Sequence, residues 1–220
     1  MLIIIHRELV LLLTIENTKS KPMPLKDQIK NYAKKLVEDR PEPALLRGMI
    51  RTRKPTAIMF ADDGIVPNNP RFPLLIYRSA IIGERRFDLA TVIEALFEVN
   101  GWRRSWRDTV YDFVHYHFQI HEVLGVARGD AKIECGGVKG RIIAVKAGDV
   151  VVLPAGTGHR LIEASTNFLV VGAYPEHGTY DECTDTRDRP DAIKRISKVR
   201  KPVKDPVYGS SGPLNRLWHR

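Results

Sequence analysis

The sequence predicts a protein whose core is an antiparallel β barrel or sandwich, flanked by helices. The 220 residues are 43% hydrophobic and 28% charged, which allows a packed core and excludes a wholly disordered chain. At about 150 residues per domain, this length fits one domain with additions or two small domains. From residue 111 onward, short apolar runs alternate with turn residues at even spacing, a pattern typical of antiparallel sheets.

Seven of these runs are predicted as strands. Each is short, and the turns between them contain glycine, proline, asparagine or aspartate, as at Gly129-Asp130 and Pro154-Ala155-Gly156. The predicted strands are 111–118, 122–128, 131–135, 141–145, 149–153, 159–163 and 168–174. They place the barrel at about residues 108–176.

Two segments precede the predicted barrel. Residues 1–23 are expected to be a poorly ordered extension: they are apolar but interrupted by charges, and no run reaches the ~18 residues that span a bilayer. No signal-peptide cleavage site is evident either. Residues 24–107 are expected to form a helical and short-strand extension packed on the barrel. Its first helix is predicted over 24–40, where apolar residues recur at helical spacing and prolines follow.

The rest of this extension is predicted as two strands and a second helix. The apolar runs Ala57–Phe60 and Leu74–Tyr77 are separated by turn residues and indicate short strands. Asp88 is the expected N-cap of a helix with one apolar stripe, which ends at Asn100-Gly101. Residues 177–220 are charged and proline-rich, and are expected to be a tail that clasps the barrel.

The chain carries a formal charge of +9, and this excess is spread along its length. A basic run, Lys194–Lys204, lies in no nucleic-acid motif, so nucleic-acid binding is disfavoured. We interpret the positive charge as serving mainly to keep the protein soluble. Cys135 and Cys183 are too few for a disulfide scaffold or a thiolate zinc site. We therefore expect a protein of the reducing cytoplasm, without a membrane segment.

Four polar side chains stand near the ends of predicted strands. His115 and His117 are two positions apart on one strand, so both rings leave the same face of the sheet. Glu122 opens the next strand, and His159 opens a later one. Inside a barrel these side chains could converge, and three imidazoles with one carboxylate suit a divalent first-row metal.

The spacing of these residues resembles the two motifs of the cupin superfamily. The matching positions are His115, His117, Glu122 and Gly129 in the first motif, and Gly148, Pro154, Gly156 and His159 in the second. Thr109 stands where the first motif has glycine, and Glu163 where the second has asparagine. The resemblance implies an all-β core formed by a single cupin barrel (double-stranded β-helix or jelly roll), with flanking N-terminal helices and short strands and a C-terminal tail.

A closer resemblance is to the YjlB-type bacterial cupins, a family without an assigned function. It covers roughly residues 55–220 and rests on stretches inside and outside the barrel. These are His115–His117, His121–Gly125, Val170–Pro175, Asn100–Trp102 and Asp205–Gly209. The resemblance implies that the flanking segments and the barrel form one unit. It also implies that two copies pair as a homodimer, as cupins commonly do.

No dinucleotide loop, Walker loop or nucleophile elbow is found, so catalysis is expected to depend on the metal. The leading hypothesis is an enzyme of the oxygenase or isomerase type, acting on a small molecule with one iron, manganese, nickel, copper or zinc ion per chain. Glu122 is the candidate catalytic group, either as a fixed ligand or, off the ion, as a proton acceptor. The alternative is a non-catalytic cupin that binds or senses a small ligand.

Several neighbouring residues have less certain roles. Strict alternation turns His121 away from Glu122, which favours a supporting role over direct ligation. Cys135 is expected to be a small core residue. Tyr111, Phe113 and Tyr174 could line the pocket, with the barrel core as the alternative. Arg103 or Arg128 could meet an anionic substrate, whereas Arg160, which follows His159, is expected to point outward.

Overall fold

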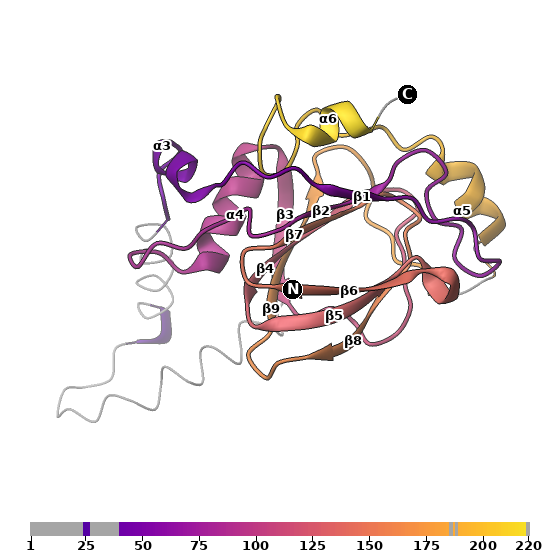
Figure 1. The fold of residues 1–220 in the computed structure, drawn as a ribbon, viewed down its shortest axis with the longest axis horizontal. Helices are drawn as coiled ribbons and strands as arrows, with labels where there is room; N and C mark the ends of the chain where they lie inside the picture. The colour runs from indigo at the N-terminus through magenta and orange to yellow at the C-terminus, as the bar shows by residue number, and fades with distance from the viewer. Residues whose placement is uncertain (1–23, 27–39, 185–186, 188, 219–220) are drawn as a thin grey trace. The chain divides into compact units, whose positions relative to one another are not determined.

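The computed structural model of the chain describes residues 24–26, 40–184, 187 and 189–218 (Figure 1). The chain divides into two compact units after Glu38, and only residues 24–26 of the first unit are described. The extension predicted over 1–23, and nearly all of the helix predicted over 24–40, lie outside the described residues. The described fold is therefore that of the second unit, Asp39–Arg220.

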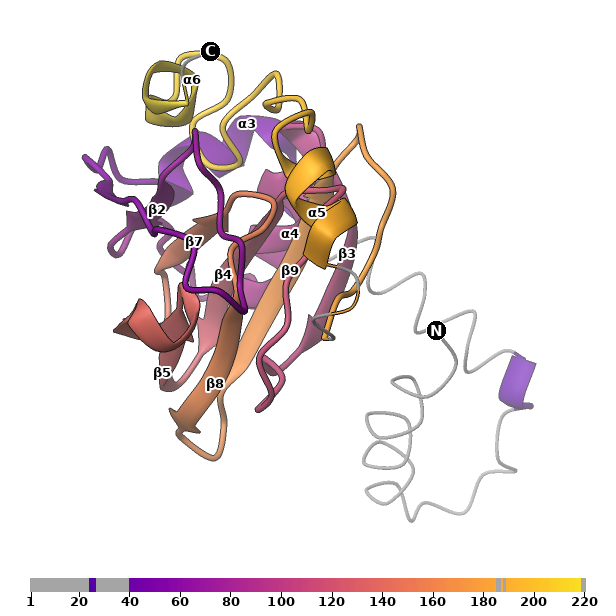
Figure 2. The same ribbon diagram turned by 90° about the vertical axis from the view of Figure 1, so that its right-hand side faces the viewer.

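Two antiparallel sheets form the centre of this unit (Figures 1 and 2). The larger sheet has the order β1-β2-β7-β4-β9-β3, and the smaller one has the order β6-β5-β8. In the larger sheet the strands are β1 (Thr56–Ile58), β2 (Leu74–Tyr77), β7 (Val150–Leu153), β4 (Glu122–Arg128), β9 (Leu169–Pro175) and β3 (Trp102–Asp108). In the smaller sheet they are β6 (Arg141–Lys146), β5 (Asp130–Cys135) and β8 (His159–Ala164). The predicted jelly-roll barrel is confirmed, and six of its seven predicted strands have ends within one residue of those observed.

Side-chain alternation along the larger sheet separates two apolar cores. Leu124 and Val126 of β4 point toward the smaller sheet, where they pack with Ile133 and other buried residues inside the barrel. Val123 points to the opposite face and packs under helix α4 (Leu89–Val99). The helix approaches β4 closely at Gly125, where a Cβ atom would lie 2.6 Å from Ile93 Cγ2. The larger sheet is therefore buried on both faces.

The remaining helices are short. They are α3 (Pro43–Leu46), η1 (Arg47–Met49), η2 (Gly137–Lys139), α5 (Arg189–Ile196) and α6 (Pro213–Leu217). Helix α4 begins after Asp88, as predicted, but the Asp88 side chain makes no capping hydrogen bond. Its carboxylate instead lies 3.5 Å from Arg107 and 3.3 Å from Arg128, because these two basic side chains reach the same corner of the sheet.

The strand predicted over 111–118 is absent. His115 forms an isolated bridge with His159, and Tyr116 forms another with Cys183, so this segment changes partner after a single residue. No continuous ladder can form across such a change.

Strand β3, by contrast, was not predicted. It is the exposed edge of the larger sheet, its pairing with β9 is interrupted between Arg103 and Trp106, and Arg104 has a φ of 53°. The bulge breaks the alternation by which a strand is recognised in a sequence.

The C-terminal segment lies along the outer face of the larger sheet. Trp218 is buried, stacks on Phe72 with ring centroids 4.9 Å apart, and donates its indole N–H to Pro73 O at 2.9 Å. Trp102 donates its indole N–H to Lys204 O at 3.0 Å.

Among the described residues, no helix has the length and apolar character needed to cross a bilayer.

Candidate functional site

The structure brings together the four side chains that the sequence selects. His115, His117, Glu122 and His159 are each no more than 5% exposed. Glu122 opens β4 and points to the same face as Leu124, into the barrel. His159 opens β8 and exchanges two backbone hydrogen bonds with His115, at 3.2 and 2.9 Å, so the two rings lie side by side with centroids 4.1 Å apart.

Glu122 lies at the centre of the group. Its Oε2 atom is 3.5 Å from His117 Nε2 and 3.3 Å from His159 Nε2. Neither contact has hydrogen-bond geometry, and Oε2 is a buried oxygen without a hydrogen-bond partner among the described residues. A buried carboxylate oxygen that accepts no hydrogen bond is costly unless a neighbouring positive charge offsets the cost.

The other nitrogen of each imidazole is held by the main chain. His115 Nδ1 donates to Phe113 O and His159 Nδ1 donates to Thr157 O, each at 3.2 Å. His117 Nδ1 donates to Asp181 O. A carbonyl oxygen can only accept, so each of these Nδ1 atoms carries the proton. In the neutral form of each ring the lone pair is therefore on Nε2.

Turn and loop residues fix the segment that carries His117. Gly156 has a φ of 92°, which favours glycine, and its N–H donates to His117 O at 2.6 Å. The Asp181 carboxylate accepts the N–H groups of Phe118 and Gln119 at 2.7 and 3.0 Å. Asp181 thus holds His117 through both its carbonyl and its side chain. Its role was not predicted, because it lies in the tail, 64 positions from His117.

The charges of the group depend on burial and on mutual contact. Burial tends to raise the pKa of Glu122, but the neighbouring His117 and His159 outweigh it and hold the pKa well below its usual range. Burial tends to lower the pKa of His117, yet the Glu122 carboxylate raises it to about 9. Burial and the adjacent His159 lower the pKa of His115 to about 3. Glu122 is therefore ionised and paired mainly with His117.

Within the described ranges, no three His, Cys, Asp or Glu side chains already stand in the arrangement of a metal site. The four residues approach one another as the pairs described above rather than around a common point. Their donor atoms are nonetheless of the right kind, since Nε2 atoms and a carboxylate oxygen are common ligands of first-row metals.

Aromatic rings surround the histidines. Tyr111 and Phe113 stack on each other at 4.7 Å and are 49% and 43% exposed, so they form part of the mouth of the site and not the barrel core. Tyr111 meets His115 edge-on at 5.1 Å. On the other side, Tyr174 and Tyr180 lie 5.8 and 5.4 Å from the His117 ring. Tyr180 was assigned no site role from the sequence.

His121 and Cys135 have structural roles. His121 faces away from Glu122, as expected: its Nδ1 accepts the Ala155 N–H at 2.9 Å, and its Nε2–H donates to Arg200 O at 3.1 Å. Both nitrogens are used, so none is available to a metal. Cys135 is buried in the barrel core, and this burial raises the pKa of its thiol to about 12.

Three arginines near the barrel, including the two considered for substrate binding, are held by carboxylates. Arg160 points outward, as expected, and pairs with Glu134 at 3.0 Å. Arg103 lies 2.7 Å from Glu176, and Arg128 lies 3.3 Å from Asp88. Each of these ion pairs is at least partly exposed to solvent. The structure gives none of the three a place at the histidine cluster.

An interior lined by three histidines and a glutamate, between two antiparallel sheets of jelly-roll order, defines the class of the protein as a cupin. The uncharacterised protein YjlB of Bacillus subtilis (strain 168) is 40% identical over 167 residues, which is 76% of this chain and 98% of that protein. The chain belongs to the YjlB family.

Solved structures that resemble the chain include two enzymes. One is a mutant of the 3,4-ketoisomerase QdtA from Thermoanaerobacterium thermosaccharolyticum, with a TM-score of 0.34 and 15% identity, covering 44% of this chain and 74% of that one. The other is the Mn(II)-containing oxalate decarboxylase of Bacillus subtilis, with a TM-score of 0.33 and 19% identity, covering 53% of this chain and 29% of that one. No protein-family model matches the chain.

Proposed function

We propose that this protein binds one divalent transition metal through His115, His117, Glu122 and His159, and uses it as an enzyme on a small molecule. The observation that carries the proposal is the hydrogen bonding of the three imidazoles. Each Nδ1 is held by a main-chain carbonyl, which fixes the tautomer that metal-binding histidines require. The Oε2 atom of Glu122, which accepts no hydrogen bond from the described residues, supplies a fourth donor atom in the same buried space.

A metal held there would act as a Lewis acid that polarises a bound oxygen atom, which suits chemistry of the isomerase or oxygenase type. The chain's own residues would do the rest. Glu122 is ionised, so a carboxylate oxygen not engaged by the metal can accept a proton. Tyr111 and Phe113 would meet the substrate at the mouth, while Tyr174 and Tyr180 keep water from His117.

A cupin that binds a ligand without turnover is the second candidate. The aromatic rings on both sides of the histidines favour it, because they offer contact surface to a bound ligand. A metal in an enzyme must hold an exchangeable water, whereas a sensing module can keep its metal fully coordinated. Water-proton relaxation of the manganese-loaded protein separates the two.

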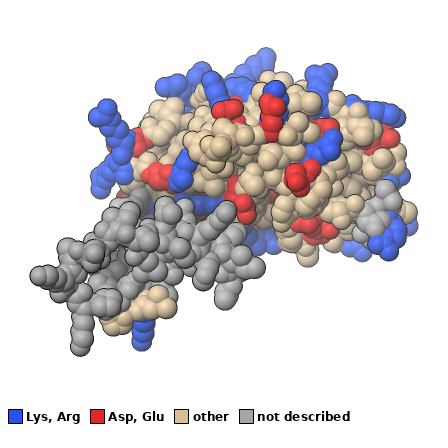
Figure 3. Space-filling view, turned by 90° about the horizontal axis from the view of Figure 1, so that it is seen from below, with Lys and Arg blue, Asp and Glu red and all other residues tan. Residues whose placement is uncertain are grey.

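Nucleic-acid binding has little support from the charges. In the view of Figure 3, Lys and Arg are interspersed with Asp and Glu instead of forming one patch. Members of the basic run 194–204 also make local contacts: Arg195 bonds Gln119 at 2.8 Å, and Lys201 bonds Asn215 O at 3.2 Å. The proposed partner is thus a small molecule. We also propose that the protein acts in the cytoplasm as a homodimer, and analytical ultracentrifugation can measure the mass of that dimer.

Elemental analysis of the purified, untagged protein is the direct test. We expect close to one equivalent of iron, manganese, nickel, copper or zinc per chain, and less than about a tenth of that in His117→Ala. Arg85→Ala, an exposed change outside the site, serves as the control and should keep the full metal content. No metal in the wild-type protein, and none taken up on titration, would refute the metal site.

Asp181 provides a finer test, as a positioning residue. Asp181→Ala removes the two hydrogen bonds that hold the backbone beside His117, and we expect metal affinity to fall by about tenfold or more. The neighbouring Glu182→Ala, which loses only a bond to the Tyr180 hydroxyl, should leave affinity within about twofold. Competition with a chelator measures both. Equal affinities in the two variants would mean that the Asp181 side chain does not position His117.

A further inference from the structure

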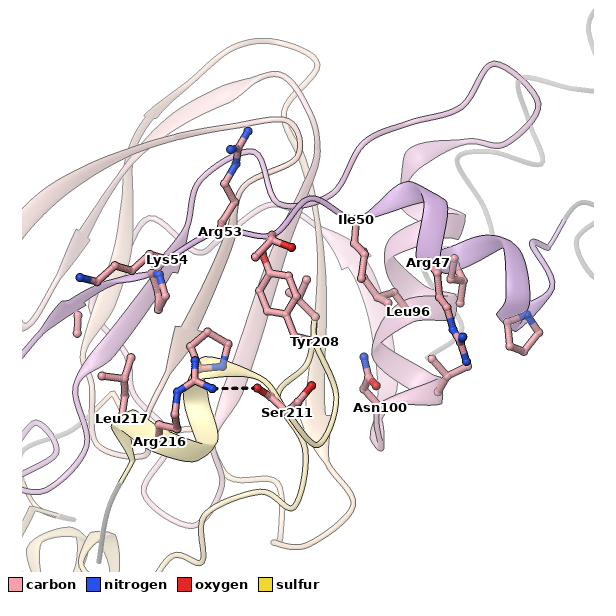
Figure 4. A pocket seen from close by; sticks show the side chains of 18 residues that line it. Arg47, Ile50, Arg53, Lys54, Leu96, Asn100, Tyr208, Ser211, Arg216 and Leu217 are labelled. Carbon is pink, nitrogen blue, oxygen red and sulfur yellow. Dashed lines mark hydrogen bonds between the residues drawn. The ribbon is translucent and has the colours of Figure 1, made fainter.

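A cavity lies on the outer face of the larger sheet, away from the histidines. Its volume is about 950 Å³, within the range of small-molecule sites, and it shares no residue with the cluster around Glu122. Four separate segments enclose it: α3 with η1, the chain leading into β1, the end of α4, and the C-terminal tail (Figure 4). Its deepest residues, Leu46, Leu96 and Val207, belong to the core on the outer face of the larger sheet.

The lining has an apolar floor and a basic rim. Leu46, Leu96 and Val207 are buried at the floor, with Ile50 and Tyr208 partly exposed beside them. The charged lining residues are Arg47, Arg53, Lys54 and Arg216, and all four are exposed. No aspartate or glutamate is among the described residues that line the cavity. In Figure 4, Arg47 lies toward one end, Arg216 and Lys54 toward the other, and Tyr208 between them.

These four cations have no carboxylate close by in the described part of the chain, where none of them forms an ion pair. Arg216 makes one hydrogen bond, to the backbone oxygen of Ser211 at 3.3 Å. Elsewhere on the molecule, Arg103, Arg128 and Arg160 all meet carboxylates. The cavity is thus a place where positive charge borders apolar surface without a described acidic partner.

The wall formed by the tail is held firmly. Tyr208 donates its hydroxyl to Arg51 O at 2.7 Å and packs edge-on against Tyr77 at 5.4 Å. Asp205, which is fully buried, accepts the N–H groups of Val207 and Tyr208 at 2.9 and 3.0 Å. The cavity is therefore preformed, which lowers the entropy lost when a ligand binds.

We infer that this cavity binds an amphipathic carboxylate with a single alkyl chain. The chain would cover Ile50, Val99 and Leu217, which are partly exposed apolar residues of the lining, and their removal from water is the main source of affinity. The carboxylate would meet an arginine of the rim, whose guanidinium fork matches a carboxylate bidentately. A neutral alkyl compound would leave the cations of the rim without a counter-charge. A short carboxylate would leave the apolar lining exposed to water. Neither therefore suits the site as well. This site is independent of the metal proposed above.

Equilibrium dialysis of the full chain with radiolabelled decanoate, below its micellar range, tests the inference. We expect saturable one-to-one binding that weakens with salt, with much weaker binding of decan-1-ol and none of acetate. The double charge reversal R47E/R216E should weaken decanoate binding by about tenfold or more, because both ends of the rim change sign. Both positions are exposed, so the variant should fold, and circular dichroism checks this.

The matched control is R85E/R141E, which makes the same change of charge at exposed positions outside the lining. It should retain decanoate binding within about twofold. Equal losses in both double variants would mean that net charge, and not this cavity, holds the anion. The absence of saturable decanoate binding would overturn the inference. So would binding to phosphatidylglycerol vesicles without binding to free decanoate, which would indicate a membrane-facing surface instead.

Discussion

Replacing Asp205 with alanine is expected to destabilise the fold by about 3–5 kcal/mol. The carboxylate is fully buried and holds the C-terminal tail on the larger sheet. One oxygen accepts the backbone N–H groups of Val207 and Tyr208, and the other accepts the Tyr77 hydroxyl at 2.5 Å and the Leu214 N–H at 3.1 Å. Alanine leaves four donors without acceptors, three of them buried, and each buried one costs about 1–3 kcal/mol before the structure relaxes.

Urea unfolding of the two proteins measures this difference directly. Asp191→Ala is the control, because Asp191 is exposed and lies 3.6 Å from Lys194, a contact worth well under about 1 kcal/mol. A loss below about 1 kcal/mol in Asp205→Ala would mean that the tail contributes little to the stability of the barrel. The same variant should weaken decanoate binding, because Asp205 fixes the tail wall of the basic cavity.

The interior of the barrel could be predicted because its signals are local. Strands such as β4 and β8 are short runs bounded by turns, and Glu122 and His159 are the first residues of these two strands. Alternation also predicted that His121 faces away from Glu122, and this holds because His121 directly precedes Glu122, the first residue of β4. The segment 111–118 was expected to be a strand and is not one, yet both of its histidines reach the cluster: His117 lies beside Glu122, and His115 lies beside His159.

The features that were not predicted depend on contacts between distant segments. Asp181 reaches His117 from the tail, and no local pattern links the two. The basic cavity is built from segments as far apart in the sequence as those of Leu46 and Tyr208. Strand β3 likewise depends on contacts with a distant segment, because tertiary packing sets both its pairing with β9 and its bulge.

His121→Ala is expected to separate stability from metal binding. The ring is fully buried, packs against Trp218 at 4.7 Å and Phe72 at 5.9 Å, and takes part in two hydrogen bonds. Its loss leaves a cavity and orphans the Ala155 N–H, so we expect a cost of about 3 kcal/mol in urea unfolding. The metal content of the folded protein should stay at the wild-type value, because neither His121 nitrogen is free.

The paired variant His159→Ala should show the opposite balance. It removes a proposed ligand, so metal content should fall to background, while the unfolding free energy of the metal-free protein should change less than in His121→Ala. A parallel loss of metal in both folded variants would make His121 a ligand and contradict the hydrogen bonding seen at its two nitrogens. If His121→Ala keeps the metal and His159→Ala loses it, His121 serves packing alone. The proposed ligand set of three imidazoles and one carboxylate then stands.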